Sequence, residues 1–145
     1  MSLCYWTVEG VGFNTNEIRP HLNKRKLINF LLKQLPDDED VLAWKNRRDL
    51  KEFDIDEWLY GQPFENLADI LTHCDDTDTL CYGDVDGDDY FYYPPSMPWH
   101  LRENDPKSLD EVHKRIVDAV MVITDLKEEE IEKLIDDDLF YVGCG

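Results

Sequence analysis

Hydrophobic residues recur every three or four positions in two parts of the chain, which is the period of one face of a helix. Between residues 24 and 35 this stripe follows Asn23, a suitable N-cap, and it stops at Pro36. Between residues 109 and 123 a second stripe follows Ser108 and Glu111, which are spaced as a capping box. The pattern therefore predicts helices over Lys24–Leu35 and Leu109–Ile123.

Weaker helical patterns lie between and after these two segments. The stretch Asp37–Phe53 is typical of a weak helix or an irregular connection. Further helices are predicted over Asp54–Tyr60, over Phe64–His73 after Pro63, and through Ile131, Leu134 and Ile135 after a second capping box formed by Asp125 and Glu128.

Strand-forming residues gather in three other places. The segment Cys4–Val8 is rich in β-formers, and Gly10 and Gly12 are expected to loosen its end. Asp86-Gly87 is a strong hairpin turn signal between two runs of β-formers. The predicted hairpin strands are Thr79–Tyr82 and Asp89–Tyr93, and a last strand is predicted over Leu139–Val142.

The order of these elements predicts an α+β fold in one domain, residues 1–145. We expect a small, mainly antiparallel sheet, made of the N-terminal strand, the central hairpin and the C-terminal strand and packed with four to five helices. The chain has no apolar run long enough to span a bilayer and no signal-peptide pattern at its start. A cytoplasmic location is expected, with Cys4, Cys74, Cys81 and Cys144 as reduced thiols.

The distribution of charge is the most unusual feature of this sequence. Between Glu52 and Leu101 there are 13 acidic residues and not one Lys or Arg. Residues 1–50 carry a net charge of +1, whereas residues 51–145 carry −19. A disordered acidic tail would contain few aromatics, but this chain is 42% hydrophobic and 12% aromatic. We therefore expect the acidic region to be folded and its carboxylates to hold fixed positions.

Basic residues are clustered at two places in the chain, residues 24–26 and 45–51. The surrounding acidity outweighs them too strongly for them to attract nucleic acid. We expect these cations to pair with acidic side chains on the same surface instead. Direct nucleic-acid binding is therefore not expected.

Motifs for metal binding and catalysis are incomplete. Asp84–Asp88 resembles the opening of a calcium loop, but the sixth and twelfth positions hold Asp89 and Pro95 where such a loop needs Gly and Glu. An ordinary hairpin turn is the better interpretation. His73-Cys74 and Cys81 lack the spacing of a zinc site. The sequence contains no phosphate-binding loop and no nucleophile motif, so no enzyme activity and no cofactor are predicted.

The acidic surface itself is the remaining candidate site. If extended, Asp84, Asp86 and Asp88 would project from one strand face about 6.6 Å apart, which is close to the spacing of phosphates on one nucleic-acid strand. The residues that could extend this row are Glu57, Glu65, Asp69, Asp75, Asp76, Asp78 and Asp89. A separate helical patch is expected from Glu128, Glu129, Glu130, Glu132, Asp136, Asp137 and Asp138.

Fixed carboxylates of this kind can occupy a groove built of Lys and Arg in a DNA-binding protein. The charge pattern is similar to that of acidic DNA-mimic inhibitors, although the likeness is one of charge and brings no motif with it. We therefore predict an inhibitor of a basic, nucleic-acid-binding host protein, of the anti-restriction or anti-CRISPR type, from a phage or another mobile element.

Three alternatives remain open at this stage. An immunity or antitoxin protein would use the same acidity to mask a basic nuclease toxin. A metal-binding or enzymatic domain would use His73, Cys74, Cys81 and the Asp84–Asp88 turn. A protein whose acidity serves only solubility would have no partner site at all.

Overall fold

The protein folds as a small antiparallel sheet flanked by helices, as the sequence predicts. The computed structural model describes residues 5–59, 63–94 and 104–144. In chain order the elements are β1 (Tyr5–Asn14), two 3-10 turns (Thr15–Glu17 and Arg19–His21), α1 (Lys24–Gln34), α2 (Glu39–Lys45), α3 (Ile55–Leu59), α4 (Leu67–Cys74), β2 (Cys81–Val85), β3 (Asp88–Tyr93), α5 (Leu109–Met121), α6 (Glu128–Leu134) and β4 (Asp136–Cys144).

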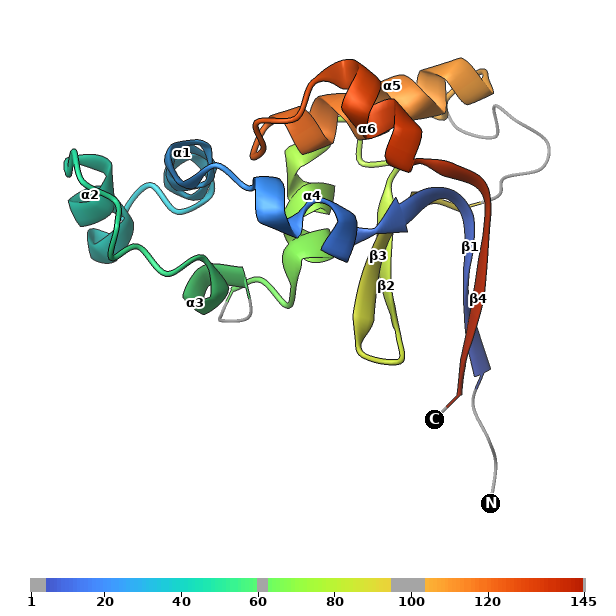
Figure 1. Ribbon diagram of the computed structural model, residues 1–145, viewed down its shortest axis with the longest axis horizontal. Helices are drawn as coiled ribbons and strands as arrows, with labels where there is room; N and C mark the ends of the chain where they lie inside the picture. Colours follow the sequence, from blue (N-terminus) through green and yellow to red (C-terminus); the bar gives the residue numbers. More distant parts are fainter. Residues whose placement is uncertain (1–4, 60–62, 95–103, 145) are drawn as a thin grey trace.

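The strands lie in the order β2-β3-β1-β4, and every pairing is antiparallel. The first half of β1 pairs with β4, where Tyr5 lies opposite Cys144, while its second half pairs with β3, where Phe13 lies opposite Phe91. Figure 1 shows β1 and β4 running together toward the two chain ends, at the opposite side of the molecule from α2 and α3. We call the paired residues 5–10 and 139–144 the terminal ribbon.

The predicted end of the first strand at Val8 is wrong, because β1 continues through both glycines to Asn14. Gly10 has φ +142°, and a Cβ atom there would lie 1.9 Å from the carbonyl oxygen of Tyr93. The β1–β4 register shifts between Gly10 and Gly12, so the strand bends at a bulge. The glycines therefore turn the strand without ending it.

This bend brings the terminal ribbon against one face of the β2–β3 hairpin. Val8 and Leu139 of the ribbon are buried against Val85 and Tyr90 of the hairpin. The indole Nε1 of Trp6 also donates a hydrogen bond to the backbone oxygen of Asp84, at 2.7 Å. The hairpin is thus packed on both faces, with the ribbon on one and helices on the other.

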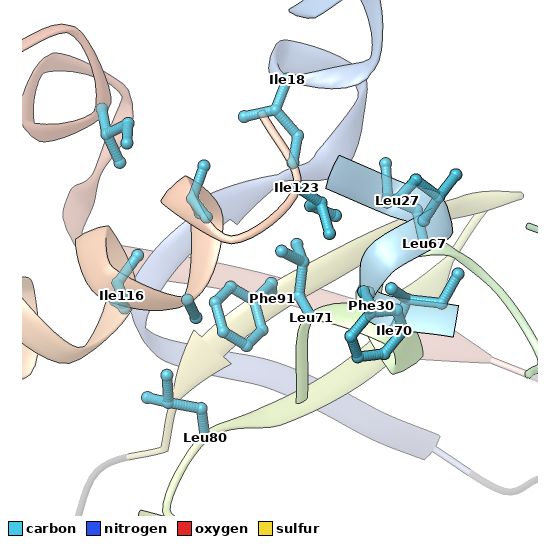
Figure 2. Close-up of a cluster of buried hydrophobic side chains, with 14 of the residues drawn as sticks. Ile18, Leu27, Phe30, Leu67, Ile70, Leu71, Leu80, Phe91, Ile116 and Ile123 are labelled. Atoms are coloured by element: carbon cyan, nitrogen blue, oxygen red, sulfur yellow. The ribbon is translucent and has the colours of Figure 1, made fainter. Parts of the chain in front are cut away.

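The main core lies between the hairpin and the helices. Phe91 of β3 is fully buried there, close to Leu71 of α4 and Ile116 of α5 (Figure 2). The stripe predicted for residues 109–123 is buried from Val112 onward, whereas Leu109 remains exposed. Ser108 caps α5 as predicted, since its Oγ accepts the N–H of Glu111.

Two predicted helix starts are wrong, while the predicted start of α1 after Asn23 is confirmed. The helix expected from Phe64 begins at Leu67, because Asn66 and not Pro63 caps it. At α6, Glu130 accepts the N–H of Lys127, so Asp125 and Glu128 do not form the expected box. The side chain of Asp125 instead accepts a hydrogen bond from Asn23.

Some sequence predictions concern residues outside the described ranges, namely those for Cys4, for the turn at Gly61 and for Pro95. Within the described ranges, no helix has the length and apolar character that crossing a membrane requires.

Candidate functional site

The candidate site is centred on the β2–β3 hairpin, which carries Asp84, Asp86, Asp88 and Asp89. Asp86 has φ 52° and Gly87 has φ 86°, so these two residues form the tight turn that the Asp-Gly pair predicts. The expectation that Asp84, Asp86 and Asp88 follow one another along a strand face is wrong. Asp84 lies on β2 and Asp88 on β3, with the turn between them.

Neutral amide groups hold two of these carboxylates in place. The side chain of Asp84 accepts a hydrogen bond from Asn66 Nδ2 at 3.2 Å. The two oxygens of Asp88 accept from Asn14 Nδ2 at 3.2 Å and from Asn16 Nδ2 at 3.0 Å. An amide fixes the position of a carboxylate without cancelling its charge, so the hairpin carries negative groups that are both ordered and un-neutralised.

Three residues of the predicted row face inward and serve the fold. Asp89 is 5% exposed, and its carboxylate accepts the N–H of Ala68 at 2.8 Å. Asp69 is 7% exposed, and its carboxylate accepts the N–H of Glu65. Asp75 is half-buried and accepts three backbone N–H groups in the loop before β2. These carboxylates position the site, and their oxygens are occupied.

The remaining predicted residues are exposed, apart from the half-buried Asp88, and they lie on three separate parts of the molecule. Asp76 and Asp78 belong to the loop between α4 and β2. Glu57 is on α3, where it lines a shallow groove with Asp38 and Asp40. The predicted row is therefore not continuous. Four residues remain at the hairpin, and we call them the acidic hairpin surface: Glu65, Asp84, Asp86 and Asp88.

Burial and neighbouring carboxylates raise the pKa values of several groups at this surface. The pKa of Asp84 is raised above its ordinary value by partial burial and then by the neighbouring carboxylates of Asp89 and Glu65. The hydrogen bond from Asn66 offsets only part of that rise. Burial and nearby carboxylates also raise the pKa values of Tyr82 and Tyr90. Among the described residues, Arg19 forms the one ion pair at the hairpin base, 3.7 Å from Asp89.

The second acidic patch, which was predicted around α6, is organised differently. His113 of α5 lies between two carboxylates, with Nδ1 2.6 Å from Glu132 and Nε2 2.5 Å from Asp137. Partial burial lowers the pKa of His113, but hydrogen bonds to both carboxylates outweigh burial and the pKa rises. When it is protonated, the imidazole of His113 neutralises part of this patch, a role that the sequence did not reveal.

Contrary to expectation, the described side chains of the basic cluster at residues 24–26 are bonded to backbone carbonyl groups and not to acidic side chains. Arg25 donates to the backbone oxygens of Lys45 and Arg47, at 3.0 and 2.6 Å. Lys24 donates to the backbone oxygen of Leu50, at 3.0 Å. Lys26 donates to the backbone oxygen of Thr124, at 2.7 Å. These cations satisfy carbonyl groups at the ends of helices and turns, so they do not neutralise the acidic hairpin surface.

Cysteine and metal chemistry find little support at the residues singled out for them. Burial, with the carboxylate of Asp75 as a further cause, raises the pKa of Cys74 to about 12, so this side chain remains a thiol. Within the described residues, neither Cys74 nor Cys81 belongs to a disulfide. In the part of the chain that is described, no three His, Cys, Asp or Glu side chains are grouped to hold a metal ion.

In comparisons with known proteins, no family model, curated protein or solved structure matches the chain.

Proposed function

We propose that this protein is an acidic inhibitor that binds the basic groove of a nucleic-acid-binding protein through the acidic hairpin surface. Its carboxylates would take the place of nucleic-acid phosphates in a groove lined by Lys and Arg, such as that of a restriction or CRISPR nuclease. Charge neutralisation between the two surfaces, with release of their counterions, would drive the binding.

The way in which the hairpin carboxylates are held is the observation that supports this proposal. Asp84 and Asp88 are fixed by the side-chain amides of Asn14, Asn16 and Asn66. No described cation forms an ion pair with any of the four residues of the acidic hairpin surface. Solubility requires negative charge but not this ordering. An ordered array, in contrast, costs a partner less entropy to recognise.

The inward-facing carboxylates have a supporting part in this proposal. Asp89 ties the hairpin to the start of α4 through Ala68, and Asp69 ties Glu65 to the same helix. The negative charges of Asp89 and Glu65 also act on Asp84, whose pKa they raise. A cationic partner would relieve that repulsion, so its binding should favour the charged form of Asp84.

The proposal is tested by capture on the immobilised protein at low salt, followed by salt elution and identification of the eluted proteins. With the purified partner, affinity should fall at least about tenfold between 50 and 200 mM salt. Affinity that is unchanged at 1 M salt, where the screening length is about 3 Å, would reject the mechanism.

A pair of matched variants tests the position of the site. Asp84→Asn with Asp86→Asn removes two charges from the hairpin, and we expect it to weaken binding about tenfold or more. Asp40→Asn with Glu57→Gln removes the same charge from the groove at α2 and α3, which Figure 1 places away from the hairpin. Equal losses in both variants would indicate that total charge matters and not the hairpin.

A further inference from the structure

The outer face of the terminal ribbon carries exposed apolar side chains that the acidic hairpin surface does not explain. Tyr5 is 65% exposed, Phe140 57% and Val142 49%. Val8 and Leu139 point to the other side, where they are buried against the hairpin. Because side chains alternate along a strand, the three exposed residues share the face that points away from the hairpin.

The ribbon also has a free edge. β4 pairs with β1 along Asp136–Cys144 and with no other described strand. Outside the ladder, residues 137–144 take part in none of the backbone–backbone hydrogen bonds of the described residues, and only the N–H of Asp138 is bonded to a side chain, that of Asp136. An exposed edge with unpaired N–H and C=O groups is a template for the addition of another strand.

One end of the same face is negatively charged. Glu9 lies opposite Phe140 in the register, so these two side chains share the outer face, and the exposed Asp138 precedes Phe140 by two positions. A shallow groove of about 270 Å³ runs between them, lined by Glu9, Gly10, Asp137, Asp138, Leu139 and Phe140. No described cation pairs with Glu9 or Asp138, so this groove is suited to a Lys or Arg side chain beside an aromatic ring.

We propose that β4 accepts an extended segment of a partner protein as an additional strand, with apolar side chains over Phe140 and Val142 and a Lys or Arg in the groove at Glu9 and Asp138. The partner is a cationic chain and not a second copy of this one. Two copies that each carry a charge of −18 repel one another, and self-pairing would supply no cation for the groove.

This docking site is separate from the acidic hairpin surface, which acts through charge alone. The ribbon adds backbone hydrogen bonds and apolar contact, which are insensitive to salt. Figure 1 shows the hairpin tip and the ribbon ends pointing the same way, so one partner could contact both. The two proposals can nevertheless fail independently, because different residues carry them.

The test uses the full chain and a labelled peptide in which two valines and an arginine alternate with threonines. We expect saturable binding by fluorescence anisotropy and slower amide hydrogen exchange at residues 139–143. A peptide with glutamate in place of arginine should bind at least about fivefold more weakly, because it places a negative charge beside Glu9 and Asp138.

Variants of the protein separate the two parts of the site. Phe140→Thr with Val142→Thr removes the apolar contact while keeping good strand formers. Glu9→Gln with Asp138→Asn removes the negative charge of the groove. Each double variant should weaken peptide binding at least about fivefold. Met121→Gln with Val122→Thr alters two other exposed apolar residues, each 41% exposed, and should have no effect. Asp84→Asn with Asp86→Asn should also leave peptide binding unchanged, so this assay does not depend on the proposed hairpin function.

Three results would overturn the proposal. The first is no saturable binding up to about millimolar peptide, which corresponds to a binding free energy of only about −4 kcal/mol. The second is equal binding of the arginine and glutamate peptides. The third is a concentration-dependent dimer of the chain alone, seen by sedimentation and abolished by Phe140→Thr with Val142→Thr, because a second copy would then be the occupant.

Discussion

The acidic hairpin surface and the second acidic patch, around α6, differ in how their carboxylates are held. At the hairpin, Asp84 and Asp88 are held by side-chain amides, which leave their charge intact. At the second patch, Glu132 and Asp137 are held by His113, which carries a compensating charge when protonated. Two regions of similar composition therefore present different surfaces to a partner.

This difference indicates that a high density of acidic residues does not by itself identify a binding site. A carboxylate with a cationic neighbour contributes mainly to the fold, whereas one held by neutral donors remains available to an external cation. This distinction separates the acidic hairpin surface from the carboxylates that are paired with His113. It also predicts how each region responds when a charge is removed.

The largest effect is expected from Asp89→Ala, at the base of the hairpin. Asp89 is 5% exposed and accepts the N–H of Ala68 at 2.8 Å. Its removal leaves a buried donor unsatisfied and separates Arg19 from its carboxylate partner. We expect the free energy of unfolding to fall by about 2–4 kcal/mol, measured by urea denaturation.

Asp89→Asn is the control for this prediction. The asparagine keeps an oxygen that can accept the N–H of Ala68, so we expect it to lose clearly less stability than Asp89→Ala. If both variants lie within about 0.5 kcal/mol of the wild type, Asp89 does not hold the hairpin to α4.

A smaller, pH-dependent effect is expected at His113. Its pKa is raised in the folded state, so the folded protein binds this proton more tightly than the unfolded chain does. The resulting stabilisation is complete below the unfolded pKa of about 6.5 and is lost as the pH rises through the folded pKa. His113→Gln should therefore reduce the free energy of unfolding by about 1 kcal/mol at pH 5.5, and by much less at pH 9.

The measurement is urea denaturation of both proteins across this pH range, so that the titration of all other groups cancels in the difference. A stability difference between His113→Gln and the wild type that is constant from pH 5.5 to 9 would show that the imidazole acts by packing and not by charge.

At neutral pH, removal of one carboxylate from each region should change the stability of the protein differently. Burial and neighbouring carboxylates disfavour the charged form of Asp84, so Asp84→Asn should leave stability unchanged or raise it by up to about 0.5 kcal/mol. Asp137→Asn removes a partner of His113 and should lower stability by about 0.5 kcal/mol, because the pair is partly exposed. Thermal denaturation at pH 7 compares them. If both variants changed the stability in the same direction, the two regions would not differ in the way proposed.

The elements that were predicted from sequence are those defined by contacts close along the chain. The α1 helix and its Asn23 cap follow from local spacing, and the hairpin turn follows from Asp86-Gly87. The path of β1 was not predictable, because the bend at Gly10 depends on the approach of Tyr93, 83 positions away. A glycine pair read locally indicates the end of a strand, whereas here it allows a bulge.

The candidate site was only partly predictable for the same reason. The concentration of carboxylates between residues 52 and 101 is visible in the sequence. Which of them face outward depends on distant partners, such as Asn14 for Asp88, 74 positions apart. The link between His113 and Asp137 also spans 24 positions. No local pattern encodes such pairings, so an acidic stretch alone could not separate supporting carboxylates from available ones.

The smallest expected effect is a shift in the titration of one carboxyl group, and it tests the electrostatic basis of the hairpin directly. The pKa of Asp84 should lie above its ordinary value, as followed by NMR of the side-chain carboxyl carbon. Glu65→Gln removes one of the repelling charges and should lower this pKa. Asn66→Ser keeps a capping oxygen for α4 but removes the amide donor, so it should raise the pKa further. Asp86→Asn is the matched control, because Asp86 is not among the groups that shift Asp84. If Glu65→Gln and Asp86→Asn shift the pKa of Asp84 equally, the electrostatic field at the hairpin is diffuse. A cationic partner would then not be guided by the ordered position of Asp84.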